Sequence, residues 1–391
     1  MFSASSLDTL LSGLILGRFL GFSFYFMSGK LNSRREFLKL SGIGALAFFT
    51  LPLRLDRLLA STLPEREVSL PRLGRVCTAK IDGYDRPSFN GELKKTYWRD
   101  LVLSITEVTL GAEDSGHNRI WYRVADEAYV HSGDIQPVDL QKQTPAASLP
   151  EGGALAEVSV PFTDTLWDLR RPDWFSYRLY YGTTYWVRAL FEDEKGQPWY
   201  RIYDDLLQLV FFIRAEHLRI VPPEELTPLS PEVPEAEKSI IVSLPEQKLV
   251  AYEGERAVFR ARISSGVGSG KTHYASTPTG QFTTFFKRPA GHMVGGSGGS
   301  AYDLPGVPWA SYITDSGVSF HGTYWHNDFG KPHSHGCINL PNSQAKWLYR
   351  WTSPVVPPEK RHIYLPGSGT RVMIFEVPVF QTDSTAGYLP F

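Results

Sequence analysis

Three short, mainly apolar runs with mixed alternation of polar and apolar side chains lie between residues 239 and 261. These runs are Ser239–Leu244, Lys248–Tyr252 and Ala257–Ala261, with the turn pairs Pro245-Glu246 and Glu253-Gly254 between them. Alternation with a period of two is typical of strands, and proline, glycine and charged residues between such runs mark turns. We therefore predict three consecutive strands at the start of a β-rich domain.

A second pattern, over residues 68–222, consists of short strands with turn residues between them, and it repeats once. Trp121–Val124 and Trp199–Ile202 both read Trp-Tyr-Arg followed by an aliphatic residue. A stretch of aliphatic and aromatic residues follows each copy and ends at Val138 and Val221, respectively. A repeat of roughly 80 residues indicates tandem modules. We place them at 68–140 and 155–222, and each resembles the end of a bacterial SH3-like barrel.

Residues 222–238 separate these modules from the rest of the chain. They include five prolines and five glutamates, a composition that favours a stiff, extended linker without a core of its own. The next domain is expected at 239–376, followed by a tail at 377–391. Within that domain, Gly291–Ser300 holds five glycines and is predicted to be a mobile loop that acts as a lid.

The composition agrees with a mostly β protein of two or three domains. The chain has 391 residues, of which 42% are hydrophobic and 21% charged, as in globular proteins. Nineteen Tyr and ten Trp against four Met favour strands over helical bundles. Only Asn342–Tyr349 reads as a helix, with Asn342 as its expected N-cap after Pro341. The net charge of −1 gives no indication of a nucleic-acid partner.

The N-terminal segment, residues 1–60, predicts export. Asn32–Lys39 reads Asn-Ser-Arg-Arg-Glu-Phe-Leu-Lys, and an apolar run from Leu40 to Leu53 follows. This resembles a twin-arginine signal, which a translocase reads as an address. The apolar run is shorter than the roughly 20 residues of a stable membrane span. Both cleavage near Ala60 and retention as a membrane anchor remain open, as does translation from Met27.

The residues suited to catalysis are concentrated in Ser334–Asn339, which reads Ser-His-Gly-Cys-Ile-Asn, and in His321, which twelve residues separate from Ser334. A free thiol has a pKa near 8.5, so only about 3% of it is thiolate at pH 7. An adjacent imidazole can take the proton and hold it. Gly336 lets the backbone approach closely, and amides around Cys337 can face a developing oxyanion. These residues are the minimum for thiol acyl transfer, and we expect Cys77 and Cys337 to be free.

The motifs resemble the YkuD-type L,D-transpeptidase family in three places. That family has a histidine followed, after about twelve to fourteen residues, by Ser/Thr-x-Gly-Cys, as His321 and Ser334–Cys337 do here. Thr277–Phe282, Thr-Pro-Thr-Gly-Gln-Phe, resembles its TPTGxF strand entry, and Gly369–Ile374 resembles its closing strand. Asn339 stands where many members have arginine and others have asparagine. The resemblance covers roughly a third of the chain.

The resemblance implies a β-rich catalytic domain with one or two short helices and no cofactor. It implies that Cys337 is the nucleophile and His321 its base, with Gly322 near the ring. Backbone amides at His335, Gly336 and Cys337 would form the oxyanion hole. Further residues expected at the oxyanion or substrate site are Ser334 and Asn339.

Other interpretations of the same residues stay open. Five potential zinc ligands lie within seventeen residues, namely His321, His326, His333, His335 and Cys337, and zinc prefers such nitrogen and sulfur sets. Sortase-like enzymes also place histidine before cysteine but need a later arginine on a strand, and Arg350, Arg361 and Arg371 follow Cys337. Aromatic residues upstream of the site, Tyr302, Trp309 and Tyr312, could line a groove or pack in the core.

The predicted function is that of an exported peptidoglycan L,D-transpeptidase. Its partners would be peptidoglycan stem peptides, with carbapenem-type compounds as inhibitors, and its place the periplasm, the cell wall or the exterior. A membrane association through residues 1–60 is also possible. Two alternatives remain: an L,D-carboxypeptidase, in which water resolves the same acyl-enzyme, and a wall-binding protein that acts through its SH3-like modules.

Overall fold

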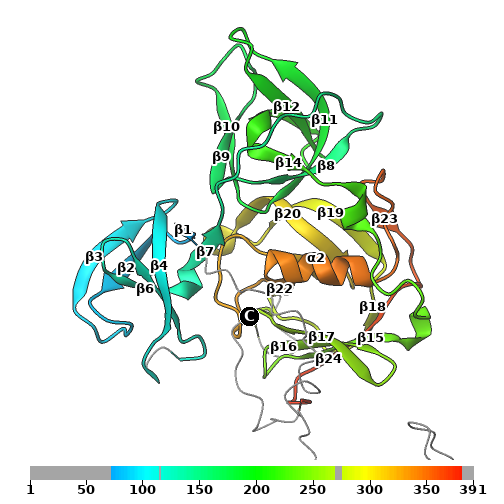
Figure 1. The fold of residues 1–391 in the computed structure, drawn as a ribbon. Helices are drawn as coiled ribbons and strands as arrows, with labels where there is room; N and C mark the ends of the chain where they lie inside the picture. Colours follow the sequence, from blue (N-terminus) through cyan, green and yellow to red (C-terminus); the bar gives the residue numbers. More distant parts are fainter. Residues whose placement is uncertain (1–71, 114–115, 269–274, 381–391) are drawn as a thin grey trace, which may run out of the picture. The chain divides into compact units, whose positions relative to one another are not determined.

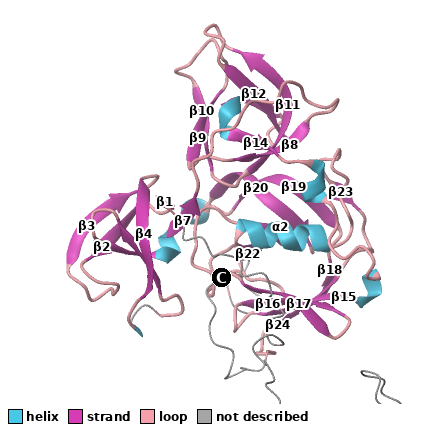
Figure 2. Ribbon diagram, in the orientation of Figure 1, coloured by secondary structure: helices cyan, strands magenta, loops and turns pink. Residues whose placement is uncertain are grey.

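The computed structural model of the protein describes residues 72–113, 116–268 and 275–380. The expected export signal lies outside these residues, as does most of the predicted C-terminal tail. Strands dominate the described ranges, where α2 (Asn342–Trp351) is the one α-helix (Figure 2). The fold is therefore mostly β, as the composition predicts. In those same ranges, no helix has the length and apolar character needed to cross a membrane.

Two seven-stranded sheets precede the region with the cysteine and histidine (Figure 1). The first β-module comprises β1 (Leu73–Val76), β2 (Lys80–Tyr84), β3 (Leu93–Trp98), β4 (Val102–Leu110), β5 (Ile120–Val124), β6 (Tyr129–His131) and β7 (Ile135–Val138). The second β-module comprises β8 (Ala154–Val158), β9 (Phe162–Leu166), β10 (Phe175–Tyr180), β11 (Thr184–Glu192), β12 (Pro198–Asp204), β13 (Leu209–Arg214) and β14 (Leu218–Ile220).

The two modules share one strand order. The first runs β3-β2-β6-β5-β4-β1-β7 and the second β10-β9-β13-β12-β11-β8-β14, which is the same sequence of positions. Trp121 and Trp199 are each the second residue of equivalent strands, β5 and β12, and both side chains are buried. Each module has its own hydrophobic cluster. The repeated motif thus has a structural counterpart, while the SH3-like identity of the modules stays a prediction.

Two five-stranded sheets form the region that follows. One has the order β17-β16-β15-β24-β18 and the other β22-β21-β20-β19-β23. Their strands are β15 (Lys238–Ser243), β16 (Lys248–Glu253), β17 (Arg256–Arg262), β18 (Gly280–Thr283), β19 (Phe286–Gly295), β20 (Tyr302–Tyr312), β21 (Ser319–Gly322), β22 (Ile338–Leu340), β23 (Ile363–Tyr364) and β24 (Arg371–Phe375). The first three coincide within a residue or two with the strands predicted from alternation.

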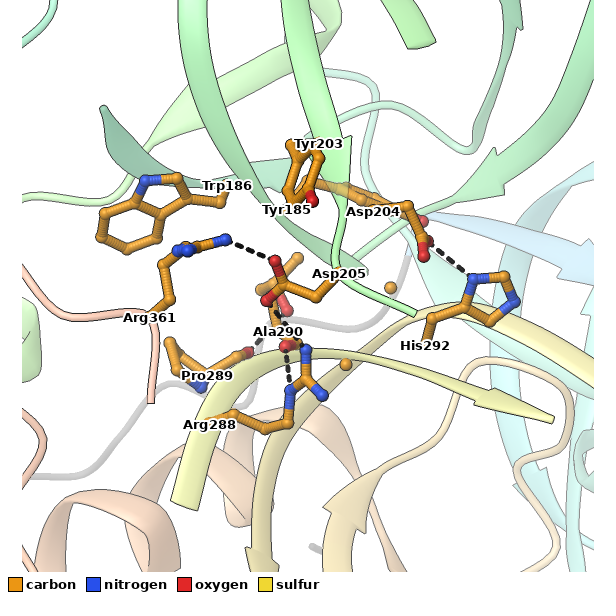
Figure 3. Close-up of a pocket in the computed structure, with 13 residues that line it drawn as sticks. Tyr185, Trp186, Tyr203, Asp204, Asp205, Arg288, Pro289, Ala290, His292 and Arg361 are labelled. Carbon is orange, nitrogen blue, oxygen red and sulfur yellow. Dashed lines mark hydrogen bonds and ion pairs between the residues drawn. The ribbon is translucent and has the colours of Figure 1, made fainter. Parts of the chain in front are cut away.

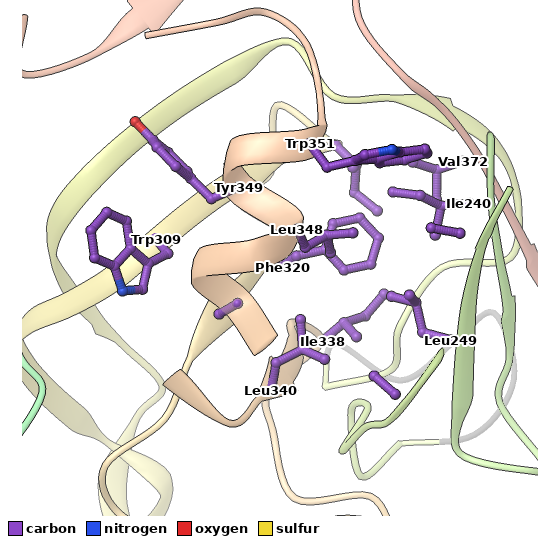
Figure 4. Packing of buried hydrophobic residues seen from close by; sticks show 14 of the residues in the cluster. Ile240, Leu249, Trp309, Phe320, Ile338, Leu340, Leu348, Tyr349, Trp351 and Val372 are labelled. Carbon is purple, nitrogen blue, oxygen red and sulfur yellow. The ribbon is translucent and has the colours of Figure 1, made fainter. Parts of the chain in front are cut away.

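Helix α2 packs into the core that these two sheets share (Figure 4). Leu348 and Trp351 of the helix are buried together with Phe320 and Ile338 of one sheet and Ile240 of the other. The buried positions follow helical spacing, so the helix is amphipathic and is stabilised by packing.

The predicted N-cap of this helix is wrong. Pro341 occupies the cap position and makes no side-chain hydrogen bond there. Asn342 is the first helical residue, and its Nδ2 donates to the carbonyl of Gly182 in the second β-module, 3.1 Å away. A tertiary contact therefore uses the side chain that local sequence assigned to capping.

Two other predicted segments also differ. Residues 222–238 contain short 3₁₀ turns at Pro223–Leu226 and Glu235–Glu237, and Leu226 belongs to the main hydrophobic core. The segment has no core of its own, and Leu226 packs into the core of the region that follows. In the glycine-rich stretch, β19 continues to Gly295 because it pairs with β20 up to Tyr302, so only the end of the stretch is a connection.

Candidate active site

Two parallel strands bring His321 and Cys337 together. His321 lies on β21, which pairs in parallel with β22, and Phe320 is opposite Ile338 in the register. Cys337 directly precedes β22, so it comes next to the histidine strand although a loop of many residues separates the two in sequence. Neighbouring strands of a sheet lie about 4.8 Å apart. The geometry therefore joins the two residues that the sequence singled out.

The surroundings of Cys337 favour its thiolate. Burial raises the pKa of this thiol, but a hydrogen bond from the His321 side chain and the charge of that ring lower it, and Ser319 adds further hydrogen bonds. The net pKa of Cys337 lies below its ordinary value. The Sγ atom is 3.7 Å from the Ser319 hydroxyl and 3.6 Å from the Gly317 carbonyl oxygen. The cysteine is free and remains partly exposed, as a nucleophile requires.

The neighbouring backbone fixes the orientation of His321. Its Nδ1 lies 2.9 Å from the carbonyl oxygen of Gly322, so the Nδ1–H group donates and Nε2 is left as the basic nitrogen of the neutral ring. A side chain at position 322 would come within 2.4 Å of Asn342 and 2.8 Å of Pro308. Glycine is therefore needed there to let β21 pass the start of α2.

Ser334 and Gly336 shape the turn that carries Cys337. The Ser334 hydroxyl donates to the carbonyl oxygen of Cys337 at 2.5 Å and accepts from the Gly336 amide at 3.1 Å. Gly336 has a φ of +124°, a region that favours glycine. Ser334 is 7% exposed and spends its hydroxyl within the turn. Ser334 is therefore a turn residue in this structure, and a contact with the oxyanion or the substrate stays a prediction.

Thr277 is a site residue whose role the sequence analysis missed. Its hydroxyl donates to the carbonyl oxygen of Gly336 at 2.8 Å and accepts from the amide of Gly266 at the same distance. One buried hydroxyl thus joins the cysteine turn to the segment at Gly266 that follows β17. The signal was present, because Thr277 opens the Thr-Pro-Thr-Gly motif that was interpreted only as a strand entry.

The amides available for an oxyanion are those of His335 and Cys337. The Gly336 amide already donates to Ser334, so the prediction that it contributes to the oxyanion hole is corrected. In the described ranges, no hydrogen-bond acceptor is paired with the backbone amides of His335 or Cys337. Unpaired amides beside a nucleophile are the donors that acyl transfer uses. Gly336 contributes the backbone conformation that the cysteine turn requires.

Asn339 does not lie on the exposed side of the site. It is fully buried, and its Nδ2 lies 3.1 Å from Nε2 of His326. The side chain of Asn339 therefore points into the interior from β22, where it contacts His326, and its contact with substrate stays a prediction.

His335, in contrast, is partly exposed, and its ring centroid lies 4.9 Å from that of Tyr302. Tyr302 and Tyr312 both stand close to the thiol. Burial raises the pKa of Tyr302, and the nearby Cys337 raises it further; the pKa of Tyr312 is raised to about 12 with burial as the main cause and Cys337 as a smaller one. Trp309 is 2% exposed and packs against Tyr349. Trp309 thus belongs to the core, whereas Tyr302 and Tyr312 lie near enough to Cys337 for its charge to raise their pKa values.

The histidines of the intervening loop have protein partners. His326 contacts Asn339 and accepts from the amide of Asp328 at 3.2 Å, and burial lowers its pKa to about 3. His333 stacks on His326 with centroids 4.3 Å apart. Within residues 72–113, 116–268 and 275–380, no cluster of three or more His, Cys, Asp or Glu side chains is arranged to hold a metal ion.

The arginines that follow Cys337 bind elsewhere. Arg350 donates to the Thr227 carbonyl, Arg361 pairs with Asp205 and Arg371 donates to the Ala236 carbonyl. These contacts all lie away from the cysteine turn, so none of the three arginines takes the place that a sortase-like site requires.

A second group of buried charges joins β19 to the second β-module (Figure 3). Nδ1 of His292 lies 2.6 Å from Asp204, and Nε2 lies 2.5 Å from Asp303. Burial lowers the pKa of His292, but hydrogen bonds to the two carboxylates outweigh it, so the net pKa is raised. Nearby, Asp205 pairs with Arg288 at 3.2 Å. The β19–β20 hairpin, which carries Tyr302, is therefore held by ionic contacts at its middle.

Comparisons with known proteins agree with the sequence motifs. The family model YkuD, described as the L,D-transpeptidase catalytic domain, matches residues 237–374. No curated protein matches the chain. Among solved structures, an L,D-transpeptidase from Mycobacterium smegmatis is 23% identical over 36% of this chain and 58% of that one, with a TM-score of 0.29. The catalytic domain of the E. faecium L,D-transpeptidase is 27% identical over 35% of this chain and 96% of that one, with a TM-score of 0.27.

A third similar structure is L,D-transpeptidase 3 from Mycobacterium tuberculosis in complex with a faropenem-derived adduct. It is 18% identical over 43% of this chain and 74% of that one, with a TM-score of 0.27. This chain spans about half the length of the first solved structures it matches. The family match supports an L,D-transpeptidase catalytic domain within this chain, at residues 237–374.

Proposed function

We propose that the protein is an exported peptidoglycan L,D-transpeptidase with Cys337 as nucleophile and His321 as its base. The observation that carries the proposal is the placement of both residues on neighbouring parallel strands inside the segment that the family model matches. The lowered pKa of the thiol and the ring orientation of His321 support it.

In the first half of the reaction, the donor is the tetrapeptide stem of a wall precursor. The Cys337 thiol gives its proton to Nε2 of His321, and Sγ forms a bond to the carbonyl carbon of the third stem residue. The bond from that carbon to the nitrogen of the terminal D-alanine then breaks, and the imidazolium returns the proton to the leaving amine. The product is a thioester on Cys337 and free D-alanine.

In the second half, an amine of another stem attacks the thioester carbonyl. His321 takes a proton from this amine and returns it to the departing sulfur, so that the cross-link forms and the free thiol is restored. In both halves the negative carbonyl oxygen is stabilised by the amides of His335 and Cys337. Losing one such donor typically costs about a hundredfold or more in rate.

Tyr302 and His335 contact each other through their rings, the charge of Cys337 raises the pKa of Tyr302, and we expect both rings to flank the donor stem. We further propose that carbapenem-type compounds acylate Cys337, since their strained amide carbonyl would meet the same nucleophile and the same amides. The twin-arginine-like motif supports export and a place in the wall compartment. No cofactor takes part in the steps above.

The test is a product assay with the full chain and a tetrapeptide stem. With an acceptor stem present, the proposal predicts a cross-linked dimer and one D-alanine released per bond, both absent from the Cys337→Ala variant. D-alanine release with a tripeptide product, unchanged by the acceptor, would instead assign an L,D-carboxypeptidase. Absence of any reaction, together with retention of the protein on isolated sacculi, would favour the wall-binding alternative.

A further inference from the structure

The loop between His321 and Cys337 is held by the first β-module. Asn327, in the middle of this loop, donates its backbone amide to the Gly133 carbonyl at 2.7 Å and its side-chain Nδ2 to the Ser132 carbonyl at 3.3 Å. Both acceptors lie in the short 3₁₀ turn Ser132–Asp134 between β6 and β7. The loop thus has backbone hydrogen bonds to a part of the chain almost two hundred residues away.

Asp328 is the charged centre of this contact. Its side chain is 7% exposed and accepts from His117 of the first β-module at 2.8 Å and from Asn118 at 3.4 Å. Lys331 and His333 of the loop itself pair with its other oxygen. Burial raises the pKa of Asp328, but these partners outweigh it and hold the pKa far below the usual range. Asp134 and Arg262 are further charges near the group.

The same residue is connected to the cysteine strand. The Asp328 amide donates to Nδ1 of His326, and Nε2 of that ring contacts Asn339, two residues after Cys337. The Ser264 hydroxyl donates to the Asp328 carbonyl at 3.3 Å, and Ser264 also forms a β-bridge with Asn339. A continuous set of buried contacts therefore leads from His117 to the strand that starts after the nucleophile.

A second buried charge secures the start of the loop. Arg75 of β1 is 2% exposed and donates to the carbonyl oxygen of Tyr324 at 2.6 Å. Its guanidinium lies 4.0 Å from the ring centroid of Tyr180, on β10 of the second β-module. The Tyr180 ring in turn stacks on Tyr324 with centroids 5.4 Å apart and an interplanar angle of 25°. Both β-modules therefore contact the loop at Tyr324, three residues after His321. The first does so through Arg75 and the second through Tyr180.

Two buried charges at one loop indicate that these contacts specify the position of the loop. Burying a charge is costly unless it is paired and fully hydrogen-bonded, and paired buried charges specify one arrangement rather than add much stability. The segment Tyr324–Asp328 is held at both ends. Arg75 of the first β-module contacts Tyr324, and Asp328 itself accepts from His117 of the same module. The loop is thereby fixed at the points that determine how β21 and β22 approach each other.

We propose that Arg75 and Asp328 are positioning residues, through which the N-terminal β-modules hold His321 and Cys337 within hydrogen-bonding distance. The modules would then support the acyl-transfer site structurally, in addition to any role they have in binding the wall. The proposal deepens the proposed function, but its physical content, the pairing of the imidazole with the thiol, can be measured without a wall substrate.

This positioning role predicts a change in the pKa of the Cys337 thiol when the loop is loosened. The groups that face Cys337 are His321, Ser319, Tyr302 and Tyr312, and His321 is the one that lowers its pKa most. If the loop loosens, the ring moves away from Sγ, and the pKa of the thiol rises toward about 8.5 or higher. Variants in the first β-module, far from Cys337 in sequence, should therefore change the acidity of this cysteine.

The experiment measures iodoacetamide alkylation of Cys337 against pH, in full-length variants, with peptide mass spectrometry to separate it from Cys77. The test variants are His117→Ala and Asp328→Asn, and His117→Gln is the conservative variant that keeps a donor toward Asp328. Asp126→Asn is the control. It removes a carboxylate of the same module that accepts from Tyr97 and Lys95 and does not touch the loop.

We expect His117→Ala and Asp328→Asn to raise the pKa of Cys337 by roughly one unit, equivalent to about a tenfold loss of thiolate near neutral pH, while His117→Gln and Asp126→Asn leave the profile at the wild-type position. Wild-type profiles in both test variants would overturn the proposal. If Asp328→Asn does not fold, the proposal is tested by His117→Ala alone, because the His117 side chain is 28% exposed. Failure of the wild type to process stem peptides would refute the proposed function without affecting this measurement.

Discussion

The Nδ1 atom of His321 lies 2.9 Å from the carbonyl oxygen of Gly322, its own neighbour in the chain. This hydrogen bond fixes the tautomer without a third catalytic side chain. A backbone carbonyl thereby does what a carboxylate does in many catalytic triads. The proton on Nδ1 leaves Nε2 free to accept the thiol proton, which agrees with the lowered pKa of Cys337.

Replacing His321 with alanine should slow acylation of Cys337 most strongly near neutral pH. Since the ring lowers the thiol pKa, its loss leaves a cysteine that ionises only near about 8.5 or above. The defect should be roughly a hundredfold at pH 7 and shrink as the pH rises. The measurement is the pH profile of acylation, with His362→Ala as control because His362 is an exposed histidine of the same domain. A defect independent of pH would argue against the base role.

Thr277→Val should slow acylation about tenfold or more while the protein stays folded. Valine keeps the shape of threonine but loses the hydroxyl that joins the Gly266 amide to the Gly336 carbonyl. A buried amide without an acceptor costs about 1–3 kcal/mol, and the cysteine turn loses its anchor. Thr279→Val is the matched control, since Thr279 is exposed in the same motif. Equal rates for the two variants would show that the hydroxyl does not position the turn.

The sequence predicted the first three strands of the C-terminal domain and the repeat of the N-terminal modules, because these depend on local patterns. Its motifs singled out His321 and Cys337, which the fold places on or beside neighbouring strands. It did not predict what Asn342, Ser334 and Asn339 do. Asn342 and Asn339 find their partners through the tertiary fold, in the Gly182 carbonyl and the His326 ring. Ser334 instead donates within its own turn, to the carbonyl oxygen of Cys337. Spacing along the chain carries no information about tertiary partners such as those of Asn342 and Asn339.

The pairing of His292 with Asp204 and Asp303 should make stability depend on pH. The folded pKa of His292 is raised above its ordinary value of about 6.5. The stabilisation is therefore complete below the unfolded pKa and is lost as the pH rises through the folded one. The melting temperature of the wild type should exceed that of His292→Gln by more at pH 6 than at pH 9, by roughly 2–4 °C for each 1 kcal/mol. A difference that is constant across this range would contradict the raised pKa.

Removal of metal ions should leave acylation and the melting temperature unchanged. His326 and His333 are engaged with Asn339, Asp328 and each other, and the proposed chemistry needs only the thiol, the imidazole and backbone amides. The check is dialysis against a strong chelator followed by both measurements. A loss of rate or stability that added zinc restores would return the histidines and Cys337 to the role of metal ligands.

The most direct test of the central claim is intact-protein mass spectrometry after incubation with a tetrapeptide stem or a carbapenem. The wild type and Cys77→Ala should each gain the mass of one acyl group, because Cys77 is buried and burial raises its pKa to about 11. Cys337→Ala should gain none, although its melting temperature stays near that of the wild type. Acylation or turnover by Cys337→Ala would contradict the assignment of the nucleophile and, with it, the mechanism proposed for this site.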